Sequence, residues 1–160
     1  YNHFTDKEAL LAALAEDGFR AITAAQIEAV ETPVSIDARL VALGKAYVSF
    51  ALAHPQLYRL MYGVGVSGWC RHPAVTDRKH ASFEPVQSAL AAYLGPGTDP
   101  SKTRIAAVSA WAQVHGLSML LLDGSLGIDL DAAGTADALV EQILANFVAG
   151  LKHDGTANAG

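Results

Sequence analysis

The sequence predicts an all-α protein, a bundle of about six helices. Apolar residues make up 51% of the chain, with Ala and Leu the commonest of them, and charged residues make up only 17%. Ala and Leu are strong helix formers, whereas the β-branched and aromatic residues that favour strands are sparse between the turns. The apolar content suffices for a sizeable core, which excludes a charge-rich disordered chain.

A long first helix is predicted from about residue 7 to the turn before Pro33. Asp6 supplies an N-cap carboxylate for the unpaired amides of the first turn. Small and apolar residues recur along this segment at helical spacing: Leu11, Leu14, Gly18, Ile22, Ala25 and Ala29. The helix ends before Pro33 because a residue that precedes proline disfavours the helical conformation.

One long and one short helix are expected next. Ser35 caps the long one, whose apolar stripe identifies it as a central helix. That stripe consists of Ile36, Leu40, Leu43, Tyr47 and Phe50. His54 and Pro55 close it, and Pro55 can open the short helix as its first residue.

The second half of the chain contains three more predicted helices. They cover about residues 74–94, 100–122 and 131–152, and the last of them begins at either Asp131 or Thr135. Pro85 lies inside the first and should kink or restart it. Asp99 caps the second, in which Pro100 takes the first helical position.

The last two long helices are apolar on more than one side, which indicates a partner subunit. Small residues on one face of helix 100–122 would let another helix approach closely. Two such helices from each subunit form a four-helix interface, so a homodimer is expected. The predicted interface residues are Ala112, Gly116, Leu120, Val140, Leu144, Phe147 and Leu151.

Charge and cysteine content restrict the partners of the chain. The net charge is −5 and no Lys/Arg cluster occurs, so most of the chain is not expected to contact nucleic acid. The single cysteine, Cys70, excludes an internal disulfide and fits a reducing cytosol. The longest apolar run is too short to span a bilayer and no secretory signal is recognisable, so we expect a cytoplasmic protein without a membrane role.

The first residues resemble the end of a DNA-reading helix. The run Tyr1-Asn2-His3-Phe4, followed by Lys7, is similar to the end of the helix-turn-helix in TetR-like repressors. The resemblance implies that Tyr1, His3 and Lys7 contact DNA phosphates and that Phe4 fills the core of the DNA-binding domain. Asn2 departs from the many relatives that have a second aromatic residue there. The alternative for this segment is an ordinary helix start with an aromatic staple.

A second string points to the same family. Residues 111–116 (Trp-Ala-Gln-Val-His-Gly) resemble the Trp–His–Gly signature of one subgroup of TetR-like C-terminal domains. The resemblance covers essentially the whole chain and implies an all-helical ligand-binding domain that dimerises through a four-helix interface. It assigns residues 1–6 to the end of the DNA-binding domain and 7–153 to the ligand-binding and dimerisation domain. The sequence after His153, residues 154–160, is predicted to be a disordered tail.

Large side chains on several predicted helices should converge on one interior. A mostly apolar cavity with a few polar anchors is the usual form of a small-molecule site. The predicted lining residues are Tyr47, Phe50, Met61, Trp69, Phe83, Trp111, His115 and Met119. For each of them a plain core position is the alternative, because aromatic and Met residues at helical spacing also fill cores.

The connection over residues 63–73 carries signals of other functions that the context does not support. Its glycines match the dinucleotide fingerprint, but a helix and not a strand precedes them, so a lid or hinge over the pocket explains them better. Cys70 and His72, even with His80 nearby, are too few ligands for a metal site. A redox role for Cys70 would need nearby positive groups to lower the thiol pKa, and only Arg71 and His72 are close in the sequence.

These observations predict a homodimeric, ligand-responsive transcriptional repressor. A small, largely apolar effector would bind the cavity and release operator DNA, which is contacted mainly by a domain outside this sequence. The alternative is a stand-alone helical module for small-molecule binding or dimerisation, without a DNA role. No catalytic motif, cofactor or metal site is predicted.

Overall fold

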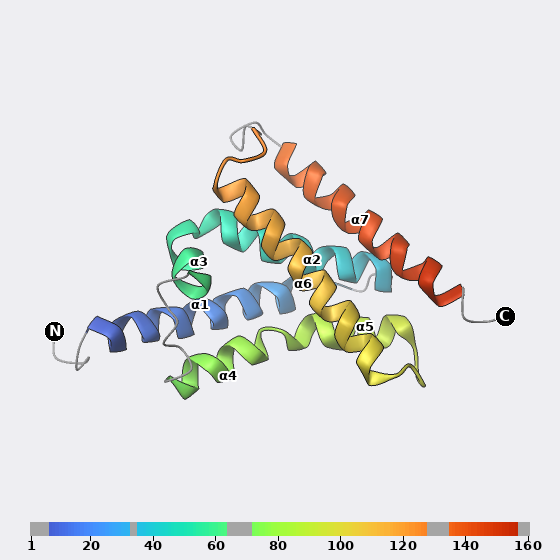
Figure 1. Ribbon diagram of the computed structural model, residues 1–160, viewed down its shortest axis with the longest axis horizontal. Helices are drawn as coiled ribbons and strands as arrows, with labels where there is room; N and C mark the ends of the chain where they lie inside the picture. The colour runs from blue at the N-terminus through green and yellow to red at the C-terminus, as the bar shows by residue number, and fades with distance from the viewer. Residues whose placement is uncertain (1–6, 33–34, 64–71, 128–134, 157–160) are drawn as a thin grey trace.

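The structure, a computed structural model, describes residues 7–32, 35–63, 72–127 and 135–156, with side chains up to residue 151. All regular secondary structure in these ranges is helical, which confirms the predicted all-α class (Figure 1). The helices are α1 (Lys7–Ala29), α2 (Ile36–Ala53), α3 (Pro55–Tyr62), α4 (Pro73–Ala81), α5 (Glu84–Leu94), α6 (Pro100–Leu122) and α7 (Thr135–Thr156).

The predicted helix starts rest on capping contacts that the structure contains. Ser35 Oγ accepts a hydrogen bond from the Ala38 amide at 3.2 Å, and Asp99 Oδ1 accepts one from the Ser101 amide at 2.8 Å. Each side chain satisfies an amide that lacks a partner within its helix. Pro55 occupies the first turn of α3, as its fixed φ predicts. The proposed cap at Asp6 lies outside the described residues.

The segment predicted as one helix over 74–94 is two helices. α4 ends at Ala81 and α5 begins at Glu84, with Pro85 in the first turn of the second helix. A proline in a helix interior would lose one backbone hydrogen bond and clash with the preceding turn, so the chain restarts the helix here. The last helix extends to Thr156, beyond the predicted end at Lys152.

α2 is the central helix, as its apolar stripe predicts. It packs against α1, α3, α5, α6 and α7, and in Figure 1 the long helix α6 passes across it. Lys45 on α2 bonds Asp137 at 3.0 Å and Glu141 at 2.9 Å on α7. α4 lies along α1, so the segment that follows the connection is held against the first helix.

The packing around α1 and α2 is very close at two glycines. A Cβ on Gly18 would stand 2.5 Å from the Met61 sulfur, and a Cβ on Gly44 would stand 2.6 Å from a Leu144 methyl group. Neither distance leaves room for a side chain. These contacts hold α3 against α1 and α7 against α2, and so fix part of the walls of the interior.

One described helix, α6, is long and apolar enough to cross a membrane by length and composition. Core helices of globular proteins pass the same test. Val114, Leu117 and Leu121 of α6 are buried against the other helices, which accounts for part of its apolar character.

Candidate functional site

A cavity of about 740 Å³ lies among the helices, with residues of α1 to α7 on its walls. Its size falls in the range typical of small-molecule sites, roughly 300–1,000 Å³. Much of the wall is apolar, and its apolar lining residues include Leu40, Leu43, Phe83, Val86, Val114 and Phe147. An interior of this kind binds apolar surface by the hydrophobic effect.

Four polar aromatic side chains from α2, α3 and α6 form a hydrogen-bonded cluster at one wall. The Trp111 indole N–H donates to the Tyr47 hydroxyl at 3.2 Å. The Tyr47 and Tyr58 hydroxyl oxygens are 3.1 Å apart, and the Tyr58 hydroxyl is 2.7 Å from His115 Nδ1. Because an indole can only donate, one consistent pattern runs from Trp111 through Tyr47 and Tyr58 to His115 as final acceptor.

This aromatic cluster is uncharged at neutral pH. Burial lowers the pKa of His115, and the positive charge of Lys79 lowers it further. Burial raises the pKa of the Tyr47 and Tyr58 hydroxyls. A neutral imidazole can accept from Tyr58, and protonated phenols can donate, so the pKa directions agree with the hydrogen-bond pattern.

Three of the residues predicted from sequence to line a pocket do line this cavity: Tyr47, Phe83 and Trp111. The Phe83 ring meets Trp111 edge-on, with ring centroids 6.3 Å apart. His115 stands behind the wall and stacks on Trp111 at a centroid distance of 5.1 Å. His115 therefore positions lining residues and does not itself face the cavity.

The remaining predicted lining residues lie elsewhere. Phe50 and Met61 are buried in the core, where Met61 fills the space beside Gly18. Met119 is half-buried and packs against the same core cluster. All three are apolar at helical spacing, and the one-dimensional pattern does not separate a core face from a cavity face. Trp69 lies outside the described residues.

Several polar lining residues were not predicted from the sequence. Gln26 follows Ile22 by four positions on the buried face of α1, and a polar residue in an apolar stripe was a usable signal. Tyr62 on α3 also lines the cavity, as do Lys79 and Arg104. No pattern in the sequence distinguished the last two from ordinary surface charges.

The residues predicted at a subunit interface divide into two groups. On α6, Ala112 and Leu120 are exposed, and a Cβ on Gly116 would meet nothing within 4 Å. On α7, Val140 and Leu144 are buried in the core of this same chain, packed towards α2. A third α7 residue, Phe147, lines the cavity, and Leu151 is half-buried.

Of the residues assigned to DNA, only Lys7 is described. It is the first residue of α1 and is exposed. Tyr1 and His3, together with Phe4, lie outside the described residues. No three His, Cys, Asp or Glu side chains within the described ranges gather as they would around a metal ion.

Residues 40–143 match the family model described as "Tetracyclin repressor-like, C-terminal domain". The fold is similar to that of a solved protein of unknown function from Rhodococcus sp. RHA1, with 38% identity and a TM-score of 0.77 over 94% of this chain and 77% of the other. It is also similar to SCO4313, described as a candidate regulatory protein, with 21% identity and a TM-score of 0.69 over 94% of this chain and 77% of the other. No curated protein matches this chain.

Proposed function

We propose that this chain, which belongs to the family of tetracyclin repressor-like C-terminal domains, is the ligand-binding and dimerisation part of a ligand-responsive transcriptional repressor. The observation that carries the proposal is the apolar cavity of about 740 Å³ with its neutral aromatic cluster. A small effector that fills it would favour one arrangement of the helices over another. That one similar protein is described as a candidate regulatory protein agrees with this role.

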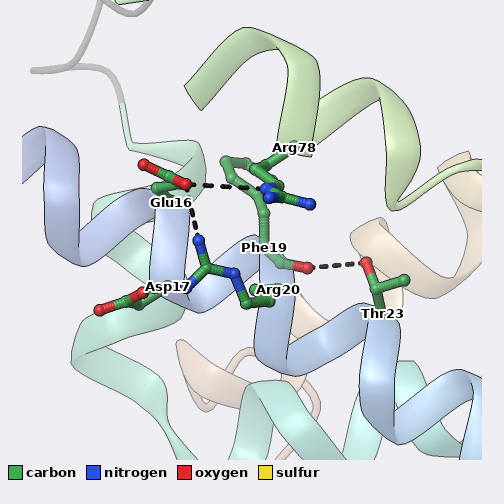
Figure 2. Close-up of polar contacts among 6 residues, drawn as sticks. All are labelled: Glu16, Asp17, Phe19, Arg20, Thr23 and Arg78. Carbon is green, nitrogen blue, oxygen red and sulfur yellow. Dashed lines mark hydrogen bonds and ion pairs between the residues drawn. The ribbon is translucent and has the colours of Figure 1, made fainter. Parts of the chain in front are cut away.

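The contacts between α4 and α1 offer a path from the cavity to the DNA-binding end. Lys79 and His80 of α4 line the cavity. Directly before Lys79 in the chain, Arg78 Nε lies 3.6 Å from Glu16 of α1, and the same carboxylate bonds Arg20 at 2.7 Å (Figure 2). These exposed ion pairs add little stability, but with the buried Val75 they keep α4 registered on α1.

Movement of α1 is the step that couples effector to operator. Lys7 begins α1, and in this proposal the same end of the chain, with Tyr1 and His3, contacts the DNA phosphates. A tilt of α1 in each subunit would change the separation of two DNA-binding domains, which must stand about one duplex turn apart, roughly 34–36 Å. Because the coupling is reciprocal, the effector binds the DNA-bound form less tightly.

The proposed homodimer uses the outer face of α6 together with α7. Ile105 and Leu120 are 65% and 44% exposed at either end of α6, and Ala112 and Gly116 between them allow close approach. Val140 and Leu144, predicted as direct interface residues, would instead act by fixing α7 on α2. Leu151 and the polar face of α7 remain available to the partner.

The proposal is tested with the full-length protein, its own promoter DNA and a library of small apolar compounds. We expect at least one compound to weaken DNA binding. Ala91→Phe places a ring in the cavity that Ala91 lines, and it should abolish the response while DNA binding is kept. Ala92→Phe adds the same ring at an exposed neighbouring position of α5 and should respond like the wild type.

Two outcomes would contradict the proposal. A full-length protein that binds no promoter fragment would support the alternative of a stand-alone helical ligand-binding or dimerisation module. A response that survives in Ala91→Phe would place the effector outside this cavity.

A further inference from the structure

Gln26 is a buried polar side chain whose amide oxygen has no hydrogen-bond donor in the described part of the chain. It is 5% exposed, it lines the cavity, and its Oε1 finds no donor. Buried amides in native proteins are almost always paired, and an unpaired one calls for an explanation such as a ligand. The position of Gln26 on the cavity wall makes a bound molecule the fitting partner.

The charged residues on the cavity wall are all basic. Lys79 on α4 and Arg104 on α6 line it, with His80 beside Lys79, and none of the described lining residues is acidic. This bias is unexpected in a chain whose net charge is −5. Elsewhere, Arg20, Lys45 and Arg59 are engaged in ion pairs with carboxylates. Neither Lys79 nor Arg104 has a carboxylate within 4.0 Å among the described residues.

Lys79 and Arg104 flank different parts of the cavity. Arg104 precedes Trp111 by seven residues on α6, which is roughly 10 Å along a helix axis. Lys79 lies near enough to His115 for its charge to act on the imidazole, beside the wall that Trp111 forms. An anion held by Lys79 would therefore lie next to the aromatic cluster, with the apolar wall beyond it.

We propose that the cavity takes an amphipathic organic acid, with its carboxylate at Lys79, its apolar body along the aromatic and aliphatic wall, and a second polar group hydrogen-bonded to Gln26. The inference rests on the proposed function and names the chemical class of its effector. The hydrogen bond at Gln26 would be made at a buried side chain, where water competes less, whereas the charge-assisted pair would be made at the exposed Lys79.

The other simple ligand classes fit these walls less well. An amine would meet Lys79 and Arg104 with like charge. A neutral alcohol would leave both cations without a partner. A small polyanion would pair with the cations, but it would leave the apolar wall without contact.

The first test compares ligands that differ only in their head group. Full-length protein is titrated by calorimetry with decanoate, decan-1-ol and decylamine, each below its micelle concentration. We expect decanoate to bind at least about tenfold more tightly than decan-1-ol, and decylamine to bind most weakly. The preference for the acid should disappear in Lys79→Gln and persist in Lys102→Gln, which removes an exposed charge of α6 outside the cavity.

The second test addresses Gln26 with hydroxydecanoates that carry the hydroxyl at carbon 3, 6 or 10. At least one of them should bind several-fold more tightly than decanoate to the wild type. That advantage should vanish in Gln26→Leu, which keeps the size of the side chain and removes its amide. Retention of decanoate binding by this variant shows that it is folded, and Ala91→Phe should weaken every member of the series.

The inference is overturned if decan-1-ol binds as tightly as decanoate, if Lys79→Gln keeps the preference for the acid, or if no hydroxyl position gives an advantage that depends on Gln26. Failure of the whole series to bind would overturn it as well. The proposed function is judged separately, since a neutral or cationic compound that releases DNA through the cavity would support that function and reject the organic acid.

Discussion

α1 and α6 are both 23-residue helices packed on α2, yet their surroundings differ. The space beside Gly18 of α1 is filled by Met61, whereas nothing stands within 4 Å of where a Cβ on Gly116 of α6 would be. Phe19 of α1 is fully buried, and Phe83, which meets Trp111 of α6, faces the cavity. The part of α1 around Gly18 and Phe19 is packed in a filled core, while α6 has a cavity on one side and an open face on the other. The proposed effector site and the proposed subunit interface therefore both lie where the packing around α6 leaves space.

Removal of a large ring should show the largest difference in stability between the filled core at Phe19 and the cavity wall at Phe83. Phe19→Ala should lower the free energy of unfolding by about 3–5 kcal/mol, since it leaves a void in a filled core. Phe83→Ala should cost about half as much, because part of its ring already borders empty space. Denaturant unfolding of the two variants measures the difference. Equal losses would mean that the cavity side is as tightly packed as the core.

The glycines provide a smaller contrast of opposite sign. Gly18→Ala forces Met61 to move and should destabilise the protein by about 1–3 kcal/mol. Gly116→Ala finds open space and should raise the stability of the monomer by about 0.5–1 kcal/mol through better helix propensity. Urea unfolding compares both with the wild type. If Gly116 lies at the proposed subunit interface, the same substitution should weaken dimerisation, which sedimentation at several concentrations would detect.

Gln26 should lower the stability of the empty protein, because its buried amide oxygen lacks a donor until a ligand binds. Gln26→Leu removes a buried amide oxygen that has no donor and should stabilise the empty protein by about 1–3 kcal/mol. Gln113→Leu, a matched change at an exposed position of α6, should have little effect on thermal unfolding. A loss of stability in Gln26→Leu would mean that the amide has a partner in the protein, and the case for a ligand contact there would weaken.

The contrast between the two sides also explains what the sequence could predict. The caps at Ser35 and Asp99 act through neighbouring residues, so they can be predicted from the local sequence. Phe50 and Met61, which fill the core, occupy the same kind of apolar helical stripe as Tyr47 and Trp111, which line the cavity. Only the packing of distant helices decides which of these side chains border empty space.

The division at Pro85 shows the same limit at the level of helices. The sequence predicted a kink or a restart there. Which of the two occurs depends on how the segments before and after Pro85 pack against neighbouring helices. The restart orients α4 along α1 and α5 against α2 and α6, so that Lys79 at the end of α4 reaches the cavity. Only this arrangement of helices shows that charged residues such as Lys79 and Arg104 line the cavity.

The smallest predicted effect concerns His115, which stands where the filled side meets the cavity. Burial lowers its pKa below the ordinary value of 6.5, so the unfolded chain binds a proton more readily than the folded one. The stabilising contribution of the neutral imidazole is complete above pH 6.5 and is lost as the pH falls below that value. His115→Gln can still accept a hydrogen bond from Tyr58 but does not titrate. The stability of the wild type relative to this variant should therefore decline between pH 7.5 and 5.5 in thermal unfolding. A constant difference would mean that the imidazole is equally solvated in the folded and unfolded chains, and the cluster would then open to solvent at the cavity wall.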